Sequence, residues 1–334
     1  MEVSNSPFLA VKGGITMKKK RWKIALVTIV ASLVVIDIIA GNYFYQLAIK
    51  RGPKDFLQGN QDLEVSAETL DEFLEGDWIA WTKEQPFERL ELTSYDNLKL
   101  NGYYLPAKEP TNKTVIFAHG YLGHALDMGL FGQYYYEELG FNIFTPDLRG
   151  HGKSEGDYYG FGWHDRLDMK DWIQTIIEKN GPDTEIVLHG LSMGAATVLM
   201  TSGENLPENV KVIIADSPYT SVYDLFAYQM KRMFHLPEKP LLPTTSIVTQ
   251  MRAGYSLKEA SALEQVKKTS IPVLYLTGGA DTFVPTEMTQ VLFDHTNSEK
   301  EMYSYPGANH GESIVLYRDD YLEKVTSFID KYID

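Results

Sequence analysis

The amino-acid sequence predicts an α/β protein in which helices cover both faces of a mostly parallel sheet. Between residues 87 and 334, short runs rich in apolar residues alternate with helical segments, which is the element order of such a sheet. Several of the runs are continuously apolar, as expected for strands that are buried on both faces. The composition agrees, because 44% of the 334 residues are hydrophobic, which is enough for a large core.

The N-terminal region predicts a membrane anchor. A basic cluster at residues 18–23 precedes an almost wholly apolar stretch, and aromatic residues follow at 43–45. As a helix, residues 24–45 measure about 33 Å, which is long enough to cross a bilayer. Because basic residues stay on the cytoplasmic side, residues 1–23 are expected in the cytoplasm and the remainder of the chain outside the cell.

Two features of this stretch bear on the anchor. Asp37 lies within it, and a carboxylate is costly there, although less so near an interface. A cleaved signal peptide is the rival interpretation. It requires a small residue two positions before a cleavage site at Ala40, and Ile38 occupies that position. The anchor is therefore expected to remain attached, as a single pass in the cell membrane.

The beginning of the chain raises a separate hypothesis. Residues 1–16 do not resemble a targeting signal, whereas Met17 and the three lysines after it do. The codons AAA-GGA-GGN can encode residues 12–14, and they resemble a bacterial ribosome-binding site upstream of Met17. We therefore expect residues 1–16 to be untranslated leader. N-terminal sequencing that found Glu2 or Val3 would contradict this.

A linker is predicted at residues 46–64, followed by one domain over residues 65–334. From Gly52 onward the linker is polar, contains glycine and proline, and has no regular period. A helix is then expected from Val65 to about residue 81, with the Ser66 side chain as its N-cap.

Strands and helices follow in alternation. Residues 87–92 and 98–105 alternate apolar and polar positions around a turn, which predicts a β-hairpin. A helix over residues 166–179 is expected to be capped and solvated by Asp165 and Asp168. The other helices are expected at 131–139 and 317–332, and the other strands at 114–118, 142–145, 185–190, 210–215, 272–277 and 301–305.

Residues 219–269 interrupt this alternation. The segment is long, rich in aromatic residues, methionine and proline, and inserted between two strands, so it predicts a helical cap over the strand ends. Such a cap shapes a substrate pocket. An apolar lining is expected from Phe226, Tyr228, Met230, Met233 and Phe234, although ordinary packing within the cap is an equally good reading of each residue alone.

Residues 185–200 predict a buried strand, a sharp turn and a helix of small residues in immediate succession. Ser192 lies at the turn, in a Gly-x-Ser-x-Gly pattern that holds a serine in a strained conformation and presents its hydroxyl. Gly190 and Gly194 are needed because side chains there would collide where strand and helix cross. The backbone N–H of Met193 begins the helix and is directed toward an oxyanion formed on a carbonyl that Ser192 attacks.

Serine becomes a strong nucleophile when a histidine, oriented by a carboxylate, takes its proton. Only His295 and His310 follow the cap, and His310 lies in the loop directly after the last strand, whereas His295 ends a helix. Asp281 also lies in a loop at a strand end. We therefore predict Ser192 as nucleophile, His310 as base and Asp281 as the residue that orients the base.

Alternatives to these residues remain. Asp216 ends the strand after the nucleophile and is the rival acid. His119 is expected to pack within a loop, since it precedes the nucleophile in the chain. The remaining candidates are expected to be structural or exposed: His151, His164 and His189.

Residues 87–334 resemble the α/β-hydrolase superfamily, in its esterase, lipase and serine-aminopeptidase-like group. The resemblance rests on the Ser192, Asp281, His310 order, on the segments around them, on His119-Gly120 after an early strand, and on the pattern at residues 147–154. It implies that the backbone N–H of Tyr121 joins that of Met193 in an oxyanion hole, and that residues 147–154 form a structural loop. The His-Gly-Tyr sequence lacks the glycine run of some lipases.

The resemblance implies a serine hydrolase that cleaves carboxylic esters of small or medium acyl groups through an acyl-enzyme on Ser192. A peptidase or acyltransferase acting on peptides or cell-envelope components is the alternative, and a non-catalytic binding protein on the same scaffold is the third. No cofactor or metal is expected, because no metal-ligand cluster or nucleotide-binding glycine loop is present. The net charge of −14 argues against nucleic acid, and the absence of cysteine suits an exported protein.

Overall fold

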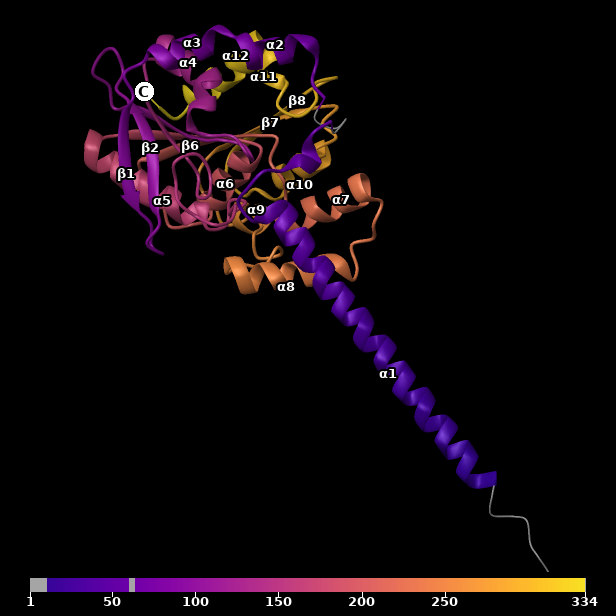
Figure 1. Ribbon diagram of the computed structural model, residues 1–334. Helices are drawn as coiled ribbons and strands as arrows, with labels where there is room; N and C mark the ends of the chain where they lie inside the picture. Colours follow the sequence, from indigo (N-terminus) through magenta and orange to yellow (C-terminus); the bar gives the residue numbers. More distant parts are fainter. Residues whose placement is uncertain (1–10, 60–63, 334) are drawn as a thin grey trace, which may run out of the picture.

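The computed structural model describes residues 11–59 and 64–333, and within them eight strands form one central sheet (Figure 1). Residues 1–10 of the predicted cytoplasmic segment, residues 60–63 of the predicted linker and Asp334 lie outside the described residues. The strands are β1 (Glu88–Thr93), β2 (Lys99–Leu105), β3 (Lys113–Ala118), β4 (Asn142–Pro146), β5 (Glu185–Leu191), β6 (Val210–Asp216), β7 (Val273–Gly278) and β8 (Lys300–Tyr305).

The sheet is mostly parallel, as predicted. Its strand order is β1-β2-β4-β3-β5-β6-β7-β8, and only the β1–β2 and β2–β4 pairs are antiparallel. The hairpin of β1 and β2 therefore forms one margin of the same sheet. The parallel strands bring their carboxyl ends to one edge, which is where α/β sheets carry their sites. Ser192, Asp281 and His310 all lie on segments that follow these ends.

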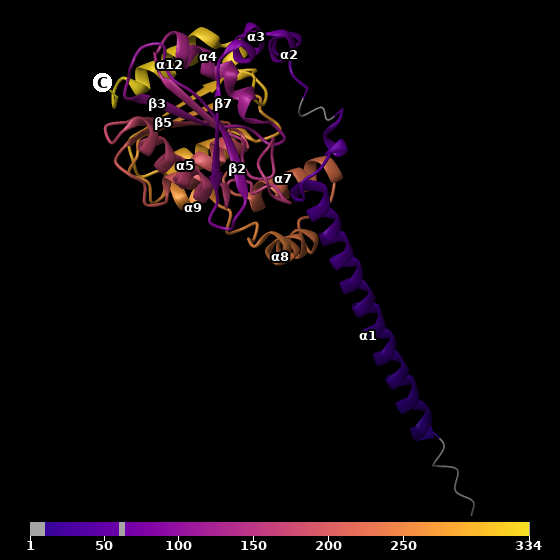
Figure 2. The same ribbon diagram turned by 60° about the vertical axis from the view of Figure 1, so that its left-hand side comes forward.

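Helices cover both faces of the sheet, and two apolar cores separate them from it (Figure 2). One face carries α5 (Asp165–Asn180), α6 (Met193–Ser202), α9 (Ala262–Val266) and α10 (Thr286–His295). The opposite face carries α3 (Asp77–Glu84), α4 (Gly129–Glu137), α11 (Ser313–Leu316) and α12 (Arg318–Ile329). The α/β fold class predicted from the alternation of elements is therefore confirmed.

The segment predicted as a cap, residues 219–269, lies between β6 and β7. Besides α9, it contains α7 (Val222–Phe234) and α8 (Leu241–Ala253). The Ser221 side chain begins α7 by accepting a hydrogen bond from the backbone N–H of Asp224, 3.0 Å away. Helix α8 packs against the N-terminal helix rather than against the sheet.

The N-terminal helix α1 (Val11–Phe44) projects from the rest of the molecule (Figure 1). Within the described residues, the helical stretch Lys20–Ile49 is the one helix long and apolar enough to cross a membrane. Its last turn, Tyr45–Ile49, is π-helical and enters the core, since Ile49 is fully buried. The predicted linker at residues 46–64 thus begins inside the packed domain, because its first residues are apolar.

The helix predicted from residue 65 to 81 is two helices. The first, α2 (Ala67–Glu75), begins as predicted with the Ser66 hydroxyl accepting from the Thr69 backbone N–H. At Gly76 the backbone is extended, with φ −60° and ψ 147°, and α3 begins directly after it. The apolar periodicity continues across this break, so it could not reveal that the chain changes direction.

Arg149 ties the loop after β4 to helix α5. Its guanidinium is fully buried and bonds both carboxylate oxygens of Asp168, at 2.7 and 2.8 Å, and also bonds Asp96. The sequence had predicted a solvated Asp168, but the side chain is buried. Burial raises its pKa to about 7. Asp165 is also buried and accepts from the Gly162 backbone N–H. Sequence periodicity missed this ion pair because its members come from different elements.

Replacing Arg149 with methionine is expected to lower the free energy of unfolding by about 3 to 5 kcal/mol. The substitution keeps the side chain long but leaves the buried Asp168 carboxylate without its partner. Urea unfolding measures the change. The control is Arg318→Met, which removes an exposed ion pair with Glu72 and should cost at most about 1 kcal/mol. Equal losses in the two variants would show that the Arg149 pair does not stabilise the loop.

Candidate active site

Ser192 sits on a strained turn between β5 and α6. Its φ of 57° and ψ of −115° are unusual for a residue other than glycine. Glycines on both sides permit the crossing: a Cβ at Gly194 would lie 1.9 Å from the carbonyl oxygen of Ala118, and a Cβ at Gly190 would lie 2.3 Å from that of Gly194. The backbone N–H of Ser192 donates to the Asp216 carbonyl (2.8 Å), which fixes the turn against β6.

Three side chains from separate loops form one hydrogen-bonded chain at this turn. The Ser192 hydroxyl lies 2.8 Å from Nε2 of His310, and Nδ1 of His310 lies 2.7 Å from Oδ2 of Asp281. Since a carboxylate can only accept, Nδ1 carries the proton and Nε2 is free to accept from the serine. The other carboxylate oxygen, Oδ1, accepts from the backbone N–H groups of Phe283 and Val284.

The environment of His310 favours its protonated form. Burial alone would lower its pKa, but the Asp281 carboxylate, by its charge and its hydrogen bond, and the charge of Asp216 together raise the pKa above its ordinary value. An imidazole that gains a proton from Ser192 is therefore stabilised by the carboxylate beside it.

Asp216, the rival acid, hydrogen-bonds other groups than His310 among the described residues. Its carboxylate accepts from the hydroxyls of Ser217 (2.9 Å) and Tyr321 (3.0 Å). The side chain is fully buried, and burial raises its pKa to about 6. The geometry thus joins Asp281, and not Asp216, to the histidine.

The remaining candidate histidines are held in packing roles. His119 is buried, with Nδ1 donating to the Gly120 carbonyl and Nε2 accepting from the Leu148 N–H. His189 lies on the elbow strand β5 itself, with its side chain fully buried in the core, and burial lowers its pKa to about 3. Burial also lowers the pKa of His151 and of His164. None of the four bonds Ser192 within the described chain.

The two predicted oxyanion residues lie beside the elbow. Met193 is the first residue of α6 and is almost fully buried. Tyr121 follows Gly120, where a Cβ would lie 3.7 Å from the Cβ of Ser192. The loop after β3 therefore passes directly alongside the serine. The Tyr121 side chain lines the same pocket as Ser192, and its hydroxyl donates to the Ala48 carbonyl (2.6 Å) in the turn that ends the N-terminal helix.

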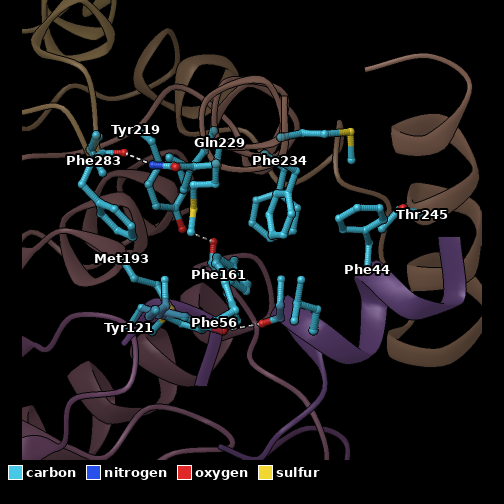
Figure 3. A pocket seen from close by; sticks show the side chains of 18 of the residues that line it. Phe44, Phe56, Tyr121, Phe161, Met193, Tyr219, Gln229, Phe234, Thr245 and Phe283 are labelled. Atoms are coloured by element: carbon cyan, nitrogen blue, oxygen red, sulfur yellow. Dashed lines mark hydrogen bonds between the residues drawn. The ribbon is translucent and has the colours of Figure 1, made fainter. Parts of the chain in front are cut away.

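An apolar pocket extends from Ser192 (Figure 3). It encloses about 770 Å³ of empty space, including its open mouth. No Asp, Glu, Lys or Arg side chain lines it among the described residues. Its polar side chains mostly bond to the protein backbone: Tyr219 to the Phe161 carbonyl, Gln229 to the Phe283 carbonyl and Thr245 to the Leu241 carbonyl.

The cap contributes much of this lining. Of the five cap residues expected there, Phe226, Met230, Met233 and Phe234 line the pocket, whereas the Tyr228 hydroxyl donates to the Thr282 carbonyl. A second group of lining residues was not predicted from the sequence. It comes from the end of the N-terminal helix and from the short 3₁₀ turn at Asp55–Leu57, and consists of Phe44, Leu47, Ala48, Phe56 and Leu57. Phe56-Leu57, an apolar pair in a polar linker, was the only signal of it.

Comparisons with known proteins agree with this architecture. Residues 109–254 match the model of the family described as serine aminopeptidase, S33. The uncharacterized protein YqkD of Bacillus subtilis is 29% identical over 254 residues, which cover 75% of this chain and 83% of that protein. The uncharacterized membrane protein YNL320W of Saccharomyces cerevisiae is 22% identical over 248 residues, covering 73% of this chain and 80% of that protein.

A solved structure shows the same fold. The Pyrococcus furiosus esterase PF2001 aligns with a TM-score of 0.62 and 24% sequence identity, over 78% of this chain and 96% of that esterase. The alignment therefore covers nearly the whole of that esterase.

Proposed function

We propose that this chain, which has the α/β-hydrolase fold, is a serine hydrolase of carboxylic esters with an apolar acyl group. The observation that carries the proposal is the hydrogen-bonded chain from Ser192 through His310 to Asp281 at the end of an apolar pocket. The similarity to a solved esterase supports the same reaction class.

In the proposed reaction, the Ser192 hydroxyl attacks the ester carbonyl while Nε2 of His310 takes its proton. Asp281 holds the imidazole in the tautomer whose Nε2 is unprotonated, and it stabilises the imidazolium that forms. The proton then passes to the departing alcohol, leaving an acyl-enzyme on Ser192. Water, activated by the same imidazole, releases the acid.

The backbone N–H groups of Met193 and Tyr121 are proposed to hold the oxyanion. Met193 is supported by its place at the start of α6, where the helix dipole adds positive potential. Tyr121 is supported by the close approach of its loop to Ser192. One such donor is typically worth about 3 to 4 kcal/mol in the transition state.

A peptidase is the second candidate, and the family description favours it. An aminopeptidase has to accommodate the charged α-amino group of its substrate close to the scissile bond. No carboxylate lines the pocket among the described residues, so a buried ammonium would lack a counter-charge. This difference is the reason for proposing an ester with an apolar acyl group.

One ester and one matched pair of anilides test the choice. Isobutyryl and alanyl p-nitroanilides share a leaving group and nearly the same shape, and differ in the ammonium. We expect the purified protein to hydrolyse p-nitrophenyl butyrate, and to prefer the isobutyryl anilide over the alanyl anilide by roughly tenfold or more in kcat/KM. A preference for the alanyl compound would replace the esterase proposal with an aminopeptidase.

We further propose that α1 anchors the chain in the cell membrane with the hydrolase domain outside. The length and apolar character of Lys20–Ile49 support this, as do the basic residues before it and the similarity to a protein named as a membrane protein. Protease treatment of intact cells should degrade the hydrolase domain. If the domain were completely protected in intact cells and digested only after lysis, it would lie inside the cell.

A further inference from the structure

The end of the proposed anchor forms one wall of the pocket. Phe44, Leu47 and Ala48 lie on the last turns of the N-terminal helix, and all three line the same cavity as Ser192. Figure 3 shows Met193 and Tyr121 at one end of this cavity and Phe44 with Thr245 at the other. The cavity therefore runs from the nucleophile to the helix that is proposed to cross the membrane.

The cap helix α8 packs tightly against the same part of α1. A Cβ at Gly41 would lie 2.9 Å from the methyl group of Thr244, so only a glycine allows this approach. The Thr244 hydroxyl also donates to the carboxylate of Asp37, which supplies the one acid of the apolar stretch with a partner. These contacts fix the cap, and thus the pocket, at the outer end of α1.

The surface of α8 suits contact with a bilayer. Ile247 and Met251 are 61% and 81% exposed, and the helix contains no acidic residue. Trp22 and Phe44 are separated by about 33 Å along a helix, so Phe44 falls where the hydrocarbon core of a bilayer ends. A helix that exposes Ile247 and Met251 together with the basic Arg252 beside that level is expected to rest among the lipid headgroups.

From these observations we infer that the substrate is an ester lipid of the membrane in which α1 lies, and that one long acyl chain occupies the cavity. This rests on the proposed serine hydrolase. The acyl chain extends from Ser192 toward Phe44, at the end of the cavity that adjoins the proposed anchor. Serine attack breaks the acyl C–O bond, the lipid alcohol leaves with the proton from His310, and water then releases a fatty acid.

Full-length protein in vesicles of an ether-linked phosphatidylcholine tests the inference, because such a bilayer contains no competing acyl ester. The substrates are p-nitrophenyl butyrate and p-nitrophenyl palmitate. Leu47→Trp fills the cavity from the anchor side and Met233→Trp from the cap side. Each is expected to lower the palmitate-to-butyrate ratio of kcat/KM by roughly tenfold or more. Tyr43→Trp is the matched control, because Tyr43 is exposed and outside the lining; its ratio should stay at the wild-type value.

Palmitate turnover is also expected to require that ester and protein share a vesicle. The inference would be overturned if palmitate turnover were equally fast with the ester in separate vesicles. It would also be overturned if neither Leu47→Trp nor Met233→Trp changed the palmitate-to-butyrate ratio of kcat/KM. Either result would leave the proposed esterase activity standing. Butyrate turnover that survives Ser192→Ala would overturn the proposed hydrolase itself. Labelling of Ser192 by a fluorophosphonate in each of the three tryptophan variants shows that the site remains folded.

Discussion

Ser192→Ala is expected to lower kcat for ester hydrolysis by a factor on the order of 10⁵ to 10⁶, because it removes the hydroxyl that bonds His310 and is proposed to form the acyl-enzyme. The same substitution should abolish labelling by a fluorophosphonate. Intact-mass analysis is the measurement: the wild type is expected to gain one adduct, and the variant none.

Ser313→Ala provides the control. Ser313 is a buried serine three residues after His310, and its hydroxyl has no hydrogen-bond partner among residues 11–59 and 64–333, so its removal leaves no group there unsatisfied. The variant should keep both turnover and labelling. An adduct that persists in Ser192→Ala, or one that disappears in Ser313→Ala, would mean that Ser192 is not the nucleophile.

Asp281→Asn is expected to lower kcat by a factor of about 10⁴ while leaving the protein folded. The amide preserves the shape of the side chain, but it can donate to Nδ1 of His310 and so favours the tautomer that protonates Nε2. That tautomer cannot accept the proton of Ser192.

The pH dependence of the Asn variant has a definite direction. The neutral imidazole is the proposed base, so kcat/KM falls as the pH drops through the pKa of His310. Burial lowers this pKa, and the charge and hydrogen bond of Asp281 raise it by more. Removing the charge lowers the pKa, so the acid limb of the residual activity should move to lower pH. A shift to higher pH would contradict the assigned contact.

Asp216→Asn tests the rival acid. Asp216 bonds two hydroxyls and does not bond His310, so the substitution should retain most of the activity at pH 8. If Asp216→Asn lost as much activity as Asp281→Asn, both carboxylates would have to act on the histidine.

Local sequence signals were sufficient for the central part of the fold. Alternating apolar runs and helices predicted the parallel sheet, and the two glycines around Ser192 predicted the elbow. The loop positions of Asp281 and His310 followed from their places after strands. These features depend on residues close together in the chain, where steric limits and the period of side chains act directly.

Contacts between distant elements were beyond such signals. The same apolar period runs through α2 and α3, although the chain turns at Gly76. Asp168 was expected in solvent because its buried partner, Arg149, belongs to another element. Burial and pairing of this kind depend on which surfaces meet after folding.

By itself, therefore, the sequence determined the succession of strands and helices along the chain, the strained serine turn and the residues available at the strand ends, since each is encoded by neighbours in the chain. Only the tertiary structure decided that His310 reaches both Ser192 and Asp281, and that Phe44 and Leu47 leave the predicted anchor to line the pocket. Those contacts join residues about 30 to 150 positions apart, and the packing of the whole sheet, cap and N-terminal helix fixes them.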